Sequence, residues 1–292
     1  MLMKATTLYL DETMKKAFVL YRRNFGALLR FALVNALCGL PMTLSSLLFP
    51  QDRTEAQVIG GLLTLVLMVT VNMKNELGAQ FYLADAMAAG SGGEMPTMKS
   101  AYAKTKGRAA NLFGNYILLL LLPGVCMLFI ALAVVILSFN ADIDEYLVPW
   151  IMLPGMIPIG LIYMPKFFLI TPMVAFEEEE SPKLTMISRM TKGNFVALVM
   201  AALVTTGIST AASFLLGFFA SNTVAATVIS AVVAMLIFGF AHALALMAYQ
   251  TLRPKPEARD DARIVERCSV PLINKITDTP EEPIADEADT QG

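Results

Sequence analysis

Six long apolar stretches alternate with polar segments along this chain. They cover residues 25–49, 58–83, 112–139, 147–176, 195–220 and 224–251. Each supplies the roughly 20 helical residues that a hydrocarbon core of about 30 Å requires. Short turns join the stretches in consecutive pairs, and longer polar segments separate the pairs. The pattern predicts an all-α membrane protein with six transmembrane helices arranged as three hairpins.

Each hairpin follows a basic segment that ends in an asparagine next to an apolar or aromatic residue. These asparagines are Asn24, Asn111 and Asn194, spaced 87 and 83 residues apart. We expect them to start the membrane helices, because an asparagine side chain accepts a hydrogen bond from an otherwise unpaired backbone N–H. The spacing predicts three repeats of roughly 85 residues, at about 8–90, 94–176 and 181–251, within a transmembrane domain of residues 1–251.

The segment before each asparagine has the spacing of a short amphipathic helix. In the first, Leu10, Met14, Phe18 and Tyr21 share one face, opposite acidic and basic side chains. Helices of this kind lie in the plane of the membrane interface, where their cations attract anionic lipid. The expected lipid contacts are Lys15, Lys16, Arg22, Arg23, Lys99, Lys104, Lys106, Arg108, Lys183, Arg189 and Lys192. The alternative is that these segments are ordinary cytoplasmic linkers.

The distribution of lysine and arginine predicts the orientation. The amino terminus, the two longer connections and the tail carry 18 of these residues, whereas the short turns carry only Arg53. Basic residues are retained on the cytoplasmic side of a membrane. Both termini are therefore expected in the cytoplasm.

Composition supports a membrane location and limits the classes of partner. Hydrophobic residues make up 56% of the chain and charged residues 16%, whereas soluble domains are about 25% charged. The net charge of −2 argues against a nucleic-acid partner. The tail, residues 252–292, is rich in proline and acidic residues and is expected to be largely disordered.

A group of polar residues within the predicted spans is the main candidate for an intramembrane site. Asn72, Glu76 and Gln80 follow one another at intervals of four, so they share a helix face. Three basic residues have similar expected depths: Arg30, Lys74 and Lys166. An intramembrane carboxylate is costly unless it is paired, so we expect a polar pocket in which Glu76 bonds to Lys166 or Arg30. The alternative is a helix that emerges into water at this point.

The sequence offers little for catalysis. It has one histidine, His242, and no nucleophile–base pair, phosphate-binding loop or metal-ligand spacing, so no enzymatic activity, metal or cofactor is expected. The acidic run of residues 177–180 is expected to be a solvated face, because adjacent carboxylates on a helix diverge.

One segment carries a family resemblance. It runs from Pro172 through Glu177 and Ser181-Pro182 to the sequence Lys192-Gly193-Asn194-Phe195. Together with the three repeated blocks, it resembles the glycerophosphoryl diester phosphodiesterase membrane-domain family and the related YciC-like bacterial integral membrane proteins. The resemblance implies a six-helix protein of the bacterial cytoplasmic (inner) membrane. In the phosphodiesterase the membrane domain accompanies a separate catalytic domain, which has no counterpart in this chain.

Three functions are compatible with these patterns. The first is a non-enzymatic membrane protein that acts through lipid or protein contacts, with a role in envelope maintenance. The second is a component of a small-molecule or lipid transporter, suggested by Glu76 and by the prolines of the fourth apolar stretch. The third is an anchor for a cytoplasmic protein partner held by the tail.

Overall fold

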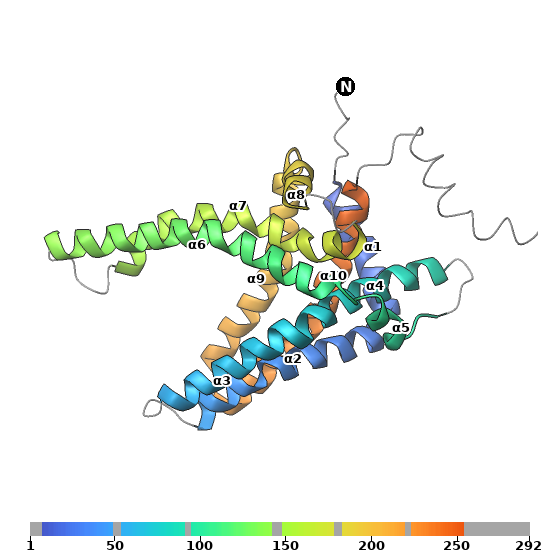
Figure 1. The fold of residues 1–292 in the computed structure, drawn as a ribbon, viewed down its shortest axis with the longest axis horizontal. Helices are drawn as coiled ribbons and strands as arrows, with labels where there is room; N and C mark the ends of the chain where they lie inside the picture. Colours follow the sequence, from blue (N-terminus) through green and yellow to red (C-terminus); the bar gives the residue numbers. More distant parts are fainter. Residues whose placement is uncertain are drawn as a thin grey trace, which may run out of the picture. The chain divides into compact units, whose positions relative to one another are not determined.

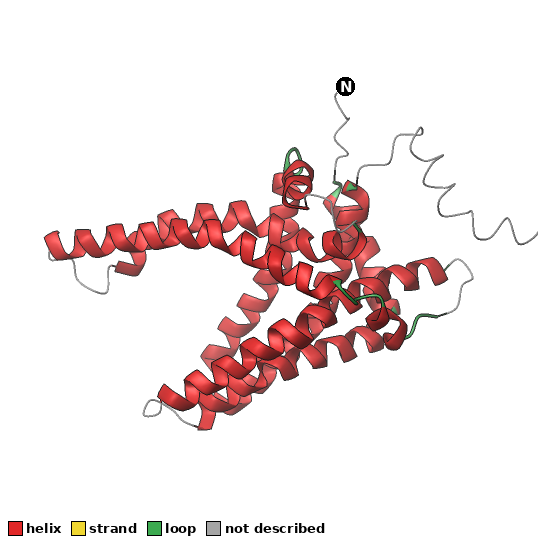
Figure 2. Ribbon diagram, viewed as in Figure 1, coloured by secondary structure: helices red, strands yellow, loops and turns green. Residues whose placement is uncertain are grey.

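A computed structural model describes the backbone of residues 8–48, 54–90, 95–141, 148–177, 183–219 and 223–253. Side chains are described for 8–45, 55–90, 95–136, 152–177, 183–208, 228–229 and 231–253. Across these residues the ordered elements are helices, without any strand (Figure 2). The predicted tail lies outside the described residues, apart from Leu252 and Arg253.

Ten helices and one short π-helical segment, η1, are described in chain order (Figure 1). They are α1 (Leu10–Arg23), α2 (Phe25–Leu48), α3 (Thr54–Leu67), η1 (Met68–Asn72), α4 (Met73–Ala89), α5 (Met98–Ala103), α6 (Arg108–Ala141), α7 (Val148–Phe176), α8 (Lys183–Thr191), α9 (Phe195–Phe219) and α10 (Thr223–Leu252).

Five helical stretches in the described part of the chain are long and apolar enough to cross a membrane. They are Phe25–Ser45, Glu55–Ala89, Arg108–Ile136, Met152–Phe176 and Ala231–Leu252. The pair formed by α8 and the start of α9 also passes this test, with a bend of 102° between its two helices, which brings the total to at most six. Consecutive long helices pack side by side, α2 with α3, α6 with α7 and α9 with α10 (Figure 1).

Much of the surface of these helices is apolar. Leu62 and Val66 on α3, and Leu121 and Phe129 on α6, are each more than half exposed. Exposed apolar surface on this scale is unfavourable in water, whereas a helix in lipid needs only its backbone satisfied internally. The structure is therefore consistent with a multi-pass membrane protein.

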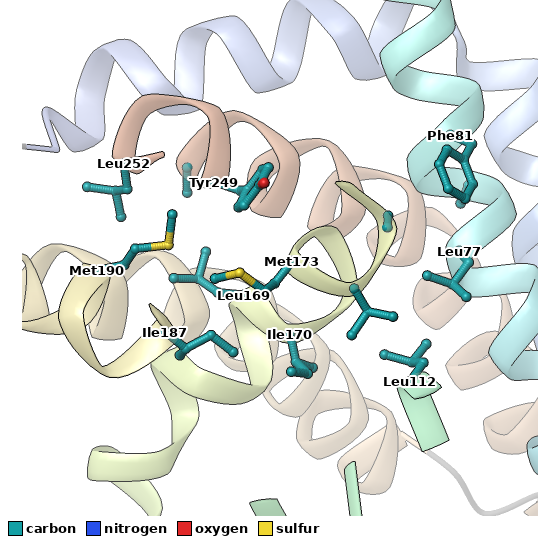
Figure 3. Packing of buried hydrophobic residues seen from close by; sticks show 14 of the residues in the cluster. Leu77, Phe81, Leu112, Leu169, Ile170, Met173, Ile187, Met190, Tyr249 and Leu252 are labelled. Atoms are coloured by element: carbon teal, nitrogen blue, oxygen red, sulfur yellow. The ribbon is translucent and has the colours of Figure 1, made fainter. Parts of the chain in front are cut away.

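The main hydrophobic core joins the first and middle turns of α4 and the start of α6 with α8 and the carboxyl-terminal parts of α7 and α10. Figure 3 shows this packing: α4 and α7 face each other, while α8 packs against α7 and the end of α10. Buried residues labelled there are Leu77, Phe81, Leu112, Leu169, Ile170, Met173, Ile187, Met190, Tyr249 and Leu252. Long helices that diverge elsewhere are thus held together at one end, next to the short helices.

The short helix α1 packs along α10 and buries Thr13, Ala17 and Leu20. The half-buried side chains of Leu10, Met14 and Tyr21 pack against a second hydrophobic cluster, which is formed by residues of α1, α2, α4, α9 and α10. Phe18, however, is 55% exposed, so the prediction of the apolar face was wrong for this residue. The reason is that contact with α10, which the sequence periodicity does not specify, selects the buried face.

Two turns that precede long helices have the same construction. Each has a buried threonine whose hydroxyl donates to a carbonyl three residues earlier, Thr105 to Tyr102 at 2.8 Å and Thr191 to Ser188 at 3.0 Å. Two residues after the threonine comes a glycine with positive φ, Gly107 at 82° and Gly193 at 96°. Glycine adopts this conformation without the steric cost that a Cβ would add.

Candidate functional site

Most of the predicted lipid-contacting cations are exposed around the ends of the long helices. The exposed ones are Lys15, Lys16, Arg22, Arg23, Lys99, Lys104, Lys106, Arg189 and Lys192. Lys15 donates to Asp11 at 2.7 Å, and this hydrogen bond raises the pKa of Lys15. Lys104 pairs with Asp85 at 2.7 Å. Exposed ion pairs of this kind contribute little stability, so these lysines remain available to other anions.

Two of the predicted lipid contacts have other surroundings. Lys183 is buried, at 4% exposure. Arg108 is half-buried, and its Nη1 donates to the backbone carbonyls of Val174 at 3.1 Å and Ala175 at 2.5 Å. A cation at a helix carboxyl terminus pairs with carbonyls that have no partner within the helix. Arg108 therefore caps α7, a role that was not predicted from the sequence.

Asn24 and Asn194 stand directly before α2 and α9, as predicted, and the known contacts of their side chains are with other segments or the preceding helix. Asn24 lies between α1 and α2, but its side chain donates backwards to the carbonyl of Leu20 at 2.9 Å. Asn111 lies inside α6, where its Oδ1 accepts from Asn115. Asn194 Oδ1 accepts from the backbone N–H of Leu8 at 2.8 Å, 186 residues away in the chain. The Asn24 side chain thus bonds to the end of the preceding helix, whereas Asn194 connects two segments that tertiary packing brings together.

Glu76 occupies a polar site between α4, α6 and α7. Its carboxylate accepts hydrogen bonds from Asn72 Nδ2 at 3.0 Å, Tyr116 OH at 3.0 Å and Thr171 Oγ1 at 3.4 Å. The π-helical segment η1 ends at Asn72, directly before α4. A π-helical turn changes the direction of the side chains that follow it, and such turns are frequent at functional sites.

The predicted pairing of Glu76 with Lys166 or Arg30 is not formed. Lys166 Nζ lies 4.3 Å from the centre of the Tyr163 ring, and Arg30 and Lys74 are exposed. No lysine or arginine within the described residues forms an ion pair with Glu76. The predicted cluster is thus divided: Asn72 contacts Glu76, and the three cations do not.

Gln80 also departs from the predicted cluster. It is fully buried and donates from Nε2 to the carbonyl of His242 at 3.3 Å, which connects α4 to α10. Its Oε1, like Asn72 Oδ1, has no hydrogen-bond partner in the part of the chain that the structure describes. Buried amide oxygens without partners are unusual and cost stability.

Two polar connections were not predicted from the sequence. Asn75 is fully buried, donates to the carbonyl of Phe31 at 2.8 Å and accepts from Tyr102 OH at 2.7 Å, so it joins α2, α4 and α5. Glu177 accepts a hydrogen bond from Tyr249 OH and pairs with Arg253 Nε at 3.1 Å. Its side chain is 11% exposed, so this member of the acidic run is not the solvated residue expected.

Comparisons with known proteins add no assignment. No protein-family model matches the chain, and searches of curated proteins and of solved structures find no match. The family resemblance therefore stays a prediction. Among the described residues, no group of three or more histidine, cysteine, aspartate or glutamate side chains is placed to hold a metal ion.

Proposed function

We propose that this chain is a non-enzymatic, multi-pass protein of the bacterial cytoplasmic membrane that acts through its basic surface on anionic lipid headgroups. The observation that carries the proposal is the row of exposed cations on α1: Lys15, Lys16, Arg22 and Arg23. They lie next to the start of α2 and beside the end of α10, where apolar helices meet polar chain. A juxtamembrane cluster of this kind attracts anionic lipid by about 1 kcal/mol per cation.

The packing of the short helices specifies the mode of contact. Ala17 and Leu20 of α1, Ala101 of α5 and Ile187 of α8 are all buried against the helix bundle. Apolar faces that are already packed against protein are not free to insert into lipid. Lipid contact is therefore assigned to the polar, basic faces and not to insertion of the whole helices.

The proposal includes six spans in three repeated units, with both termini in the cytoplasm. The matched turns at Gly107 and Gly193 support a common construction of the second and third units. In this arrangement α9 is the span that follows the bend after α8. The excess of basic residues in the termini and longer connections supports the cytoplasmic orientation.

The lipid proposal is tested by the thermal stability of the full chain in nanodiscs. Replacing phosphatidylcholine by phosphatidylglycerol is expected to raise the melting temperature at low salt, and 0.5 M salt should remove most of the gain. Changing the four α1 cations to glutamine should reduce the gain, whereas the control Arg53→Gln should preserve it. A melting temperature independent of lipid charge would overturn the proposal.

A second candidate, transport, is favoured by the surroundings of Glu76. A carboxylate among transmembrane helices with only neutral hydrogen-bond donors is a site for a proton or a monovalent cation, and such residues mark ion pathways. In this case the chain would be a component of a proton-coupled transporter.

Proton movement across proteoliposomes tests this candidate. With an imposed membrane potential, the wild type should change the reading of an enclosed pH dye, and Glu76→Gln should abolish the change. Tyr116→Phe removes one hydrogen bond but keeps the carboxylate, so it serves as the matched control. Equal responses from wild type and Glu76→Gln would exclude a role for this residue in transport.

A further inference from the structure

A cavity of about 840 Å³ lies where several helices end. Along one side it is lined by α1, and on the other by the end of α4 and the last turns of α10. Asn24 before α2, Gly90 after α4 and Thr251 near the end of α10 all belong to its wall. When apolar spans lie in a bilayer, their ends are at the level of the lipid headgroups.

The walls of this cavity divide into a basic part and an apolar part. Lys15, Lys16 and Arg23 supply the basic part, and no carboxylate is among the described residues that line it. The apolar part is supplied by Val19, Leu20, Met87, Met95 and Met247. The cavity therefore has the two surfaces that an anionic amphiphile requires.

The three cations are placed to bind a phosphate group. In the described chain Arg23 forms no ion pair, and a guanidinium binds phosphate through two parallel hydrogen bonds. Lys15 and Lys16 pair with Asp11 and Glu12, which lie outside the cavity wall. These are exposed pairs between neighbours on one helix, so a phosphate can replace or share them at little cost.

The apolar wall distinguishes a lipid from a soluble anion. Met87 and Met247 come from different helices and, with Val19 of α1, provide flexible apolar surface beside the cations. Methionine adapts to chains of varied shape, which suits an acyl chain. A free phosphate would gain nothing from this surface.

We propose that this cavity binds one anionic phospholipid, with its phosphate on Lys15, Lys16 and Arg23 and an acyl chain along Val19, Met87 and Met247. The proposal rests on the proposed function and deepens it, because it replaces a diffuse basic surface by one saturable site. A cavity of this size is within the range of about 300–1,000 Å³ that is usual for small-molecule sites.

The test compares two double variants of the full chain with equal charge change. Lys16→Gln with Arg23→Gln removes two cations from the cavity wall. Arg30→Gln with Lys74→Gln removes two exposed cations that do not line it and that are not among the proposed lipid contacts. Fluorescent phosphatidylglycerol is titrated onto each protein in neutral detergent at 0.15 M salt, and melting temperatures establish that both variants are folded.

The cavity variant should bind phosphatidylglycerol about 20- to 30-fold more weakly than the wild type, and the control variant within about threefold of it. Met95→Asp adds a negative charge at an exposed wall position, so it should also weaken binding without affecting the fold. Unlabelled phosphatidylglycerol should compete for the site, whereas soluble glycerol phosphate should not compete at the same concentration.

Each other outcome overturns a defined part of the account. Equal weakening of binding in both double variants would refute the cavity as the binding site but leave the proposed action on anionic lipid intact. If neither double variant binds more weakly, the cavity is likewise refuted as the binding site. If the protein does not prefer phosphatidylglycerol to phosphatidylcholine, the proposed function is refuted as well. Competition by glycerol phosphate would show an anion site that does not recognise lipid.

Discussion

Replacing Arg108 by alanine should destabilise the protein in the absence of any anionic lipid. The guanidinium donates to the carbonyls of Val174 at 3.1 Å and Ala175 at 2.5 Å, with a weaker contact to that of Glu177 at 3.4 Å. It also lies 5.7 Å from the centre of the Phe81 ring on α4. Removing it leaves the last carbonyls of α7 without these donors, in a half-buried position.

The expected loss follows from these contacts. Two hydrogen bonds from a charged donor contribute roughly 1.5 kcal/mol each. The favourable interaction of a cation with a helix carboxyl terminus adds about 0.5–1 kcal/mol. Arg108→Ala should therefore lower the free energy of unfolding by about 3–4 kcal/mol. Arg108→Lys keeps the charge but loses the forked geometry, so it should recover about 1 kcal/mol of this.

Equilibrium unfolding in mixed micelles of neutral detergent and sodium dodecyl sulfate provides the measurement. Lys106→Ala is the matched control, because Lys106 is a nearby exposed cation. Exposed substitutions of this kind change stability by about 0.5 kcal/mol or less. If Arg108→Ala costs under about 1 kcal/mol, or no more than Lys106→Ala, the capping role is refuted.

Three further predictions concern the turns, a buried amide and pH. Gly107→Ala and Gly193→Ala should each lower the free energy of unfolding by about 1–2 kcal/mol in the same assay, because a residue with a Cβ is strained at positive φ. The control Gly114→Ala should not lower it, because an added Cβ there meets open space. Asn75→Ala should lower the free energy of unfolding by about 1–3 kcal/mol and show coupling to Tyr102→Phe in a double-mutant cycle. Strictly additive effects of the two substitutions would contradict the hydrogen bond between these residues. Phosphatidylglycerol binding should be constant from pH 6 to 9, because the raised pKa of Lys15 keeps it charged throughout this range; a loss of affinity in this window would show that another group controls binding.

The positions of the long helices could be predicted from the sequence because they depend on local hydrophobicity. The apolar stretch 25–49 corresponds to α2, and the stretch 147–176 corresponds to α7, within one residue at each end. The second stretch was predicted too short, since the helical path continues to Ala89 and includes the π-helical segment η1. The apolar pattern does not distinguish a π-helical turn from an α-helical one, because the same apolar residues can form either.

The partners of polar residues could not be predicted in the same way. Asn24 and Arg108 were predicted as a helix start and a lipid contact, yet the Asn24 side chain bonds back to Leu20 at the end of α1, and Arg108 bonds to a carbonyl that packing of α7 brings near. Asn75 gave no signal, because its partners are 44 and 27 residues away in sequence. Similar depth in the membrane predicted that Glu76 lies near Lys166, and α7 does contact Glu76, but through Thr171. Depth does not specify which face of a helix points to the site.

Residue accessibility in living cells tests the proposed six-span arrangement most directly. In a full chain with Cys38, Cys126 and Cys268 replaced by alanine, single cysteines are introduced by Lys16→Cys, Gln51→Cys and Lys106→Cys. A membrane-impermeant maleimide should label only the Gln51→Cys protein in intact spheroplasts, and all three after permeabilisation. Labelling of the Lys16→Cys or Lys106→Cys protein from outside would contradict the account, because the basic surface would then face away from the cytoplasm.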